Sequence, residues 1–177
     1  MAIALPAPTD SHPDALALRL ASLVLGGEAS SRLFTEVREK RGLCYSVGAS
    51  VALGRDRGML QLYAGSTPQR AGQTLACILG ELRRFEAGIS HEEFERARTG
   101  MKARAIMQGE SAAARASSVA GDLFRIGRAR TLADQASDID RLTLDAVNRA
   151  VALHWNAAWV ERMTLASIGP APLEMPR

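Results

Sequence analysis

Aromatic residues are scarce in this sequence, and their shortage narrows the functions it can carry. Phenylalanine, tyrosine and tryptophan together make up 5% of the 177 residues. Proteins that bind single-stranded nucleic acid stack bases on aromatic rings within a basic groove. Here the 22 basic residues are interleaved with 19 acidic ones, which leaves a net charge of +3 and no basic run. We therefore expect no nucleic acid among the partners of this chain.

Cysteine and long apolar runs are also in short supply. The chain has two cysteines, Cys44 and Cys77, with no C-x-x-C pair and no histidine at ligand spacing. A disulfide between them stays open, although two buried free thiols are the simpler interpretation. No apolar stretch approaches the roughly 20 residues of a membrane-spanning helix. The N-terminus lacks the basic and apolar segments of a signal peptide. We expect no membrane span.

A local catalytic or metal motif is missing as well. The three histidines, His12, His91 and His154, are far apart in the sequence. The segment 91–95, HEEFE, partly resembles the metal motif H-x-x-E-H, but Glu95 stands where the second histidine belongs. A helix-capping box explains these letters better, so we predict no metal site. There is no G-x-S-x-G motif, and nothing marks Cys44 as an activated nucleophile.

The residues that are present have the composition of a globular domain, with 47% hydrophobic and 23% charged residues. Period-two alternation predicts strands over about 2–5, 45–53, 59–66 and 159–168. Helical spacing and capping residues predict helices over about 13–25, 31–41, 69–87, 91–108, 111–126, 132–140 and 143–155. This order predicts an α+β fold with a mainly antiparallel sheet and helices packed on one face.

The segment from Gly26 to Tyr45, GGEASSRLFTEVREKRGLCY, carries the most specific local signals. Ser30 or Ser31 is expected to cap the N-terminus of its helix. Gly42 is expected to take a left-handed conformation just after the helix, so that Leu43 folds back on Val37.

In this arrangement Arg38 leaves the last turn of the helix seven residues before Tyr45 opens a strand. Both side chains can then point into one space. Within the strand, alternation predicts that Tyr45 shares a face with Val47 and Ala49.

Ser30 to Val47 spells S-S-R-L-F-x-x-V-R-E-K-R-G-L-x-Y-S-V. This pattern resembles the signature of the C-terminal, non-zinc domain of insulinase/pitrilysin-type zinc peptidases, and the resemblance extends from about Ala2 to Ile168-Gly169-Pro170. In that family a zinc domain with an H-x-x-E-H motif precedes a similar domain without it, and the two close over a peptide. The resemblance implies the α/β roll of that family.

For this chain the resemblance implies a single non-zinc domain over residues 1–177, part of a longer two-domain or larger protein. It implies no cofactor in this domain and zinc in a partner N-terminal domain. The partners it implies are that zinc-bearing domain, in the same protein or in a separate catalytic subunit, and a peptide substrate. The chain is then inactive alone and contributes to a zinc metalloendopeptidase.

The resemblance also assigns roles to residues. Arginine and tyrosine at the positions of Arg38 and Tyr45 reach toward the substrate near the zinc site, so these two are the expected substrate-binding residues. Such donors stabilise a tetrahedral oxyanion or hold the peptide in register. No catalytic residue is expected in this chain alone. We expect Arg32 to be structural, tying its loop to neighbouring backbone.

Two alternatives stay open. The chain can be a non-catalytic subunit or interaction module that pairs with a separate zinc-bearing subunit. A free-standing small-molecule-binding domain is a third possibility, although no pocket motif supports it. Family habit suggests an exported or periplasmic bacterial parent, and a cytoplasmic one is also compatible with the sequence.

Overall fold

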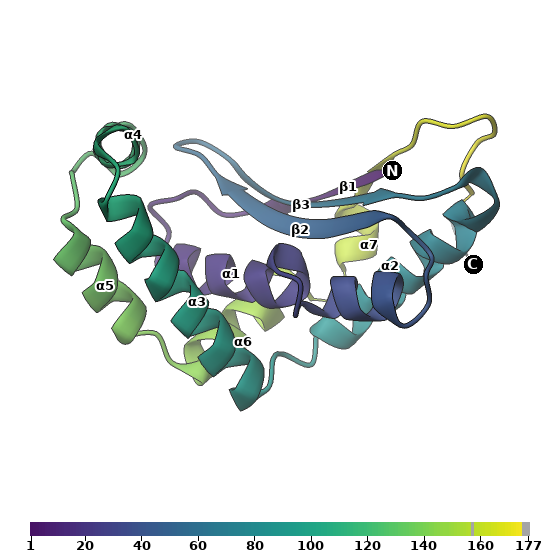
Figure 1. Cartoon of the computed structure of the whole chain (residues 1–177), viewed down its shortest axis with the longest axis horizontal. Coiled ribbons are helices and arrows are strands. Elements are labelled where there is room, and N and C mark those ends of the chain that lie inside the picture. The colour runs from purple at the N-terminus through teal and green to yellow at the C-terminus, as the bar shows by residue number, and fades with distance from the viewer. Residues whose placement is uncertain (157, 175–177) are drawn as a thin grey trace.

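The computed structural model describes residues 1–156 and 158–174 and contains a four-stranded antiparallel sheet with helices on one face (Figure 1). The strands lie in the order β2-β3-β1-β4. Their bounds are β1 (Ala2–Ala7), β2 (Ser46–Leu53), β3 (Gly58–Gly65) and β4 (Thr164–Ala166). The predicted α+β architecture is confirmed.

The helices fall close to their predicted positions. They are α1 (Ala15–Ser22), α2 (Ala71–Phe85), α3 (His91–Gly109), α4 (Ala112–Ile126), α5 (Leu132–Asp140), α6 (Leu144–His154) and α7 (Trp159–Arg162). Two π-helical segments, η1 (Leu23–Gly27) and η2 (Phe34–Glu39), and a 3-10 turn, η3 (Pro68–Arg70), complete the helical structure. Within the part of the chain that the structure describes, no helix has the length and apolar character to cross a membrane.

Strand alternation explains why one face of the sheet is covered. In β3, Leu60, Leu62 and Ala64 point into the core, whereas Met59 and Tyr63 on the opposite face, here named the outer face, are 40% and 55% exposed. The core side chains pack against the helices below the sheet (Figure 1). The largest fully buried side chains are Phe85, Ile3, Leu5, Leu18, Leu20, Leu25, Leu33, Leu60, Leu75, Ile78 and Leu79.

The predicted strand over 159–168 is largely wrong. The chain first forms the short helix α7 and then only three residues of strand, Thr164–Ala166. These pair with Ala2–Ala4 of β1. Extending the same register toward α7 brings Pro6 of β1 opposite the new strand, and proline has no backbone N–H to donate. The ladder therefore cannot continue far in that direction.

The predicted serine cap of the helix near residue 31 is also wrong. Ser31 is 3% exposed, and its hydroxyl forms no hydrogen bond among the described residues. Its backbone carbonyl accepts the amide of Thr35 at 3.0 Å, so Ser31 stands just before the helix, but its hydroxyl does not reach a free amide of the first turn. The predicted capping box at the start of α3 is confirmed, with Ser90 and Glu93 bonding reciprocally.

Candidate functional site

A tight helix-to-strand connection positions the two predicted site residues. The backbone amide of Gly42, at φ +58°, donates to the carbonyl of Arg38 at 3.0 Å. The amide of Leu43 donates to the carbonyl of fully buried Val37 at 3.0 Å. These two bonds are the C-terminal cap that the sequence predicts. The cap fixes the path between Arg38 at the end of η2 and Tyr45 at the start of β2.

Arg38 presents an uncompensated positive charge on the surface. Its guanidinium lies 4.7 Å from the ring centroid of Phe34, one turn earlier on η2. This cation–π contact supports the side chain without neutralising its charge. Among the described residues, the guanidinium forms no hydrogen bond or ion pair. Its donors are therefore open to a ligand.

Tyr45 is 67% exposed, and its ring lies against the outer face of the sheet. Its backbone amide donates to the carbonyl of Gly65 at 2.9 Å. A Cβ added to Gly65 would lie 2.4 Å from the tyrosine ring, so glycine is what lets the ring approach β3. The predicted placement of Tyr45 on the face of Ala49 is wrong. Tyr45 precedes the first paired residue of β2, Ser46, so strand alternation does not constrain it.

Tyr63 joins Tyr45 at this position, although no local pattern in the sequence points to it. Tyr63 lies on the outer face of β3, opposite Gly48 of β2. Charge repulsion by Tyr63 and a side-chain hydrogen bond in which the Tyr45 phenol is the donor raise the pKa of Tyr45. Like any tyrosine, Tyr45 is neutral at pH 7, where its phenol can donate a hydrogen bond. Tyr63 could have been identified from the small residue Gly48, which lies opposite it on the outer face. That pairing is known only once the register of β2 against β3 is known.

The two tyrosines line a cavity of about 620 Å³. The segment from Ala166 to Glu174 also lines it, together with Gly65 and Ser66 at the end of β3. This volume lies within the range of small-ligand pockets. The lining is formed by Met1, Ala2, Tyr45, Tyr63, Ala64, Gly65, Ser66, Pro68, Ala71, Gly72, Ala166, Ser167, Ile168, Gly169, Pro170, Ala171, Pro172, Leu173 and Glu174.

Arg38 is not among the residues that line this cavity. The chemistry that Arg38 and Tyr45 offer is hydrogen-bond donation and charge stabilisation. The guanidinium of Arg38 and the phenol of Tyr45 are suited to a carbonyl oxygen or a developing oxyanion. Among the described residues, no hydrogen bond joins the side chains of Arg38 and Tyr45. Neither group is a zinc ligand, and neither is a nucleophile or general base at neutral pH.

A second cavity, of about 460 Å³, lies beside the middle of β2 and is rich in arginine. Its charges are paired within the protein. Arg19 and Arg125 each lie 2.7 Å from a carboxylate oxygen of Asp10. Arg130 donates to Asp122 through two nitrogens, at 2.8 and 3.0 Å. Because these cations already have carboxylate partners, we interpret the cavity as a structural ion-pair network.

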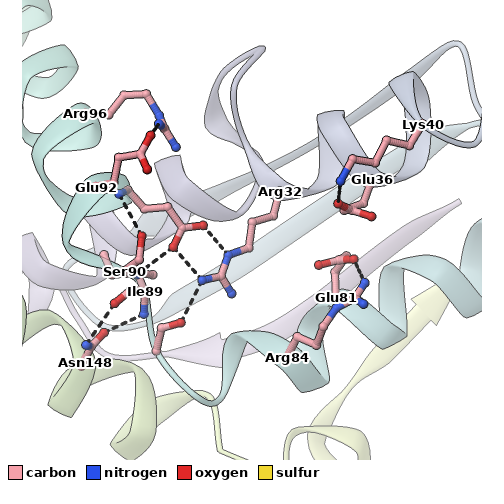
Figure 2. Close-up of polar contacts among 12 residues, drawn as sticks. Arg32, Glu36, Lys40, Glu81, Arg84, Ile89, Ser90, Glu92, Arg96 and Asn148 are labelled. Atoms are coloured by element: carbon pink, nitrogen blue, oxygen red, sulfur yellow. Dashed lines mark hydrogen bonds and ion pairs between the residues drawn. The ribbon is translucent and has the colours of Figure 1, made fainter.

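Arg32 is structural, as the sequence predicts. Its guanidinium donates to both carboxylate oxygens of Glu93, at 2.6 and 2.7 Å, and to the carbonyl of Gly88 at 3.0 Å. Burial raises the pKa of Glu93, but hydrogen bonds from Arg32 and Ser90 outweigh it and hold that pKa below its usual value. Figure 2 shows Arg32 reaching toward the start of α3, where Asn148 of α6 also bonds the backbone of Ile89.

The two cysteines are free thiols, so the disulfide alternative is wrong. Cys44 is buried and Cys77 is half-buried. Burial raises the pKa of both thiols, although Arg38 acts in the opposite direction on Cys44. Thiols in this state are poor nucleophiles.

His12 and His154 lie together, which their distance in the sequence did not suggest. Nε2 of His154 is 2.9 Å from a carboxylate oxygen of Asp14, and the rings of His12 and His154 meet edge to face at 5.1 Å. His91 lies elsewhere, exposed at the start of α3. No local motif signals this group, since 140 residues separate Asp14 from His154.

Comparison with known proteins gives a consistent family assignment. Residues 1–101 match the family model described as the peptidase M16 inactive domain. An uncharacterized zinc protease of Mycobacterium tuberculosis is 34% identical over 141 residues, which cover 78% of this chain and 32% of that protein. The chain thus spans about a third of the length of the curated relatives it matches.

Solved structures agree with the fold. A peptidase M16 inactive domain from Pseudomonas fluorescens aligns with a TM-score of 0.81 at 25% identity, covering 99% of this chain and 42% of that one. An inactive peptidase domain from Bordetella parapertussis aligns with a TM-score of 0.77 at 22% identity. That alignment covers 92% of this chain and 87% of the Bordetella chain, so the two have similar lengths.

Proposed function

Because the chain belongs to the peptidase M16 inactive-domain family, we propose that it closes the peptide-binding chamber of a zinc peptidase and supplies substrate contacts to it. The zinc-bearing partner is a domain of the same protein or a separate subunit. We propose that residues 1–177 form one non-zinc domain of that assembly. The similarly sized Bordetella chain supports a domain of this extent.

The observation that carries this proposal is the pair of open donors at the two ends of one rigid turn. Arg38 and Tyr45 are both exposed, and the cap at Gly42 fixes the backbone between them. An extended peptide passing this turn meets a guanidinium first and a phenol next. The alternative of a non-catalytic subunit shares this fold but does not require these two donors.

This chain's contribution to the reaction is binding and charge stabilisation. Zinc held by the partner domain supplies the activated water that attacks the peptide bond. Arg38 and Tyr45 orient the substrate carbonyl and share the negative charge that develops on its oxygen. The neutral phenol of Tyr45 donates a hydrogen bond there. The chain has no role in activating water.

We expect peptide hydrolysis to require both this chain and a zinc-bearing domain. The experiment mixes this chain with the zinc-bearing domain of a relative and follows cleavage of a fluorogenic peptide library in zinc. The chain alone should be inactive and the mixture active. Arg38→Ala and Tyr45→Phe should each lower kcat by on the order of 100-fold, since one oxyanion donor contributes about that much.

The matched control is Arg55→Ala, which removes an exposed arginine from the loop at the other end of β2. It should leave kcat and KM unchanged. Undiminished activity of both site variants would contradict the assigned roles. A stable complex of the two parts that cleaves nothing would favour the non-catalytic subunit, and turnover by the chain alone would reveal a site on it that we have not identified.

A further inference from the structure

Two histidines and a carboxylate gather where the segment before α1 meets the end of α6. Nε2 of His154 lies 2.9 Å from Oδ2 of Asp14, and Nδ1 of His12 lies 3.8 Å from the same oxygen. The ligand atoms of all three side chains lie within 4.8 Å of one another. These side chains are 38%, 31% and 17% exposed for His12, Asp14 and His154, so solvent ions reach them.

The tautomer of His12 makes this group suited to a cation. The backbone amide of Asp14 donates to Nδ1 of His12 at 3.1 Å, so this nitrogen carries a lone pair and no proton. The lone pair and the carboxylate are both electron-rich, and they lie near each other. The Asp14–His154 hydrogen bond accounts for His154 alone. His12 is held separately, by the amide of Asp14 and by its edge-to-face contact with the ring of His154.

We propose that His12, Asp14 and His154 bind one divalent transition-metal ion, with zinc as the representative ion. Imidazole nitrogen and carboxylate oxygen are ligands that zinc prefers. Neighbouring ligand atoms around tetrahedral zinc lie roughly 3.3 Å apart, from bonds of about 2.0–2.1 Å. The two separations to Oδ2 of Asp14, 2.9 and 3.8 Å, lie on either side of this value. Water completes the coordination.

The metal takes the place of the hydrogen between Nε2 of His154 and Asp14, so that the neutral ring carries its proton on Nδ1, and it displaces the amide hydrogen bond to His12. One carboxylate neutralises half of the ion's charge. Arg162, which donates to the backbone carbonyl of His154 at 3.3 Å, adds positive charge nearby. We therefore expect affinity in the micromolar range. The site is structural: it joins the start of α1 to the end of α6, on elements that carry neither Arg38 nor Tyr45.

The test is calorimetric titration of the tag-free 177-residue chain, stripped of metal, with zinc chloride. We expect one ion per chain and a rise in Tm on the order of 5 °C near saturation. His12→Ala, Asp14→Asn and His154→Ala should each weaken binding at least about tenfold. Affinity should also fall as the pH is lowered, because binding requires unprotonated imidazole.

Two controls separate this site from other zinc ligands. His91→Ala removes the remaining histidine, which is exposed on α3, and should leave binding unchanged. A variant with serine at both Cys44 and Cys77 should also bind normally. His154→Asn keeps a hydrogen-bond donor for Asp14 but not the metal-binding nitrogen, and it serves if His154→Ala unfolds. Absence of binding, or full affinity in the His12 and His154 variants, would overturn the proposal.

Discussion

At the scale of single residues, Arg32 anchors the segment that carries the candidate site. It bonds Glu93 through two nitrogens, bonds the carbonyl of Gly88, and stacks 5.2 Å above the ring of buried Phe85. The side chains of Arg32 and Glu93 are only 20% and 18% exposed. Their ion pair is therefore less screened by solvent than the surface pairs of this protein.

We expect Arg32→Met to lower the free energy of unfolding by about 2 kcal/mol, since it leaves Glu93 partly buried without its cation. Urea unfolding measures this change. The control is Arg96→Met, which breaks the exposed Glu92–Arg96 pair, whose side chains are 87% and 43% exposed. That change should cost no more than about 0.5 kcal/mol. Equal losses in the two variants would argue against an anchoring role for Arg32.

At the scale of elements, the approach of η1 to β2 is the tightest backbone packing near the site. A Cβ added to Gly26 would lie 2.3 Å from the backbone nitrogen of Ala49. The φ of Gly26, −159°, is open to any residue, so contact alone requires glycine here. Substitution would push η1 away from the strand that begins beside Tyr45.

We expect Gly26→Ala to destabilise the protein by roughly 2 kcal/mol, because the added methyl group overlaps backbone atoms that cannot rotate away. Thermal unfolding measures the change as a lower Tm. Gly80→Ala is the matched control, since Gly80 lies within α2 and a Cβ there meets no atom within 4 Å. That variant should gain about 0.5–1 kcal/mol from helix propensity. If Gly26→Ala left the Tm unchanged, η1 would have to move away from β2 without cost.

At the scale of the whole molecule, several carboxylates have their pKa lowered by nearby hydrogen-bond donors. Hydrogen bonds from Arg41 and Lys40 lower the pKa of Glu36 to about 2. Burial raises the pKa of Asp122, but Arg130 outweighs it and keeps that pKa below its usual value. The backbone and hydroxyl of Thr131 lower the pKa of Asp134 in the same direction.

These shifts predict loss of stability in acid. The unfolded chain takes up protons near pH 4, where the folded carboxylates with lowered pKa values still resist them. The stabilisation from these carboxylates should therefore be complete above about pH 5. Below that pH the free energy of unfolding should fall progressively toward pH 2. Urea unfolding over this pH range measures the free energy of unfolding at each pH. Glu36→Gln should make that free energy depend less steeply on pH. An unfolding free energy that stays constant from pH 6 to pH 3 would contradict the assignment.

The sequence predicts this architecture well where the signals are local. The helices, the β2–β3 hairpin and the cap at Gly42 follow from periodicity and turn chemistry. The strand near residue 160 was overpredicted, because its length depends on Pro6 in a partner strand far away in the sequence. Arg38 and Tyr45 were found through a family signature. Tyr63 required the register of β3 against β2.

The packing of α1 against α6 has a consequence for how the chain is synthesised. Leu18 and Leu20 of α1 are fully buried, yet α6 begins only at Leu144. Other parts of α1 pack on η1, β2 and α3, which are made earlier. On a ribosome that adds 5–20 residues per second, the part of α1 that packs on α6 waits roughly 6–25 s for this partner. During that interval it is exposed to chaperones and to other nascent chains. Slow translation should therefore favour aggregation of this domain more than of one whose neighbours in sequence pack together.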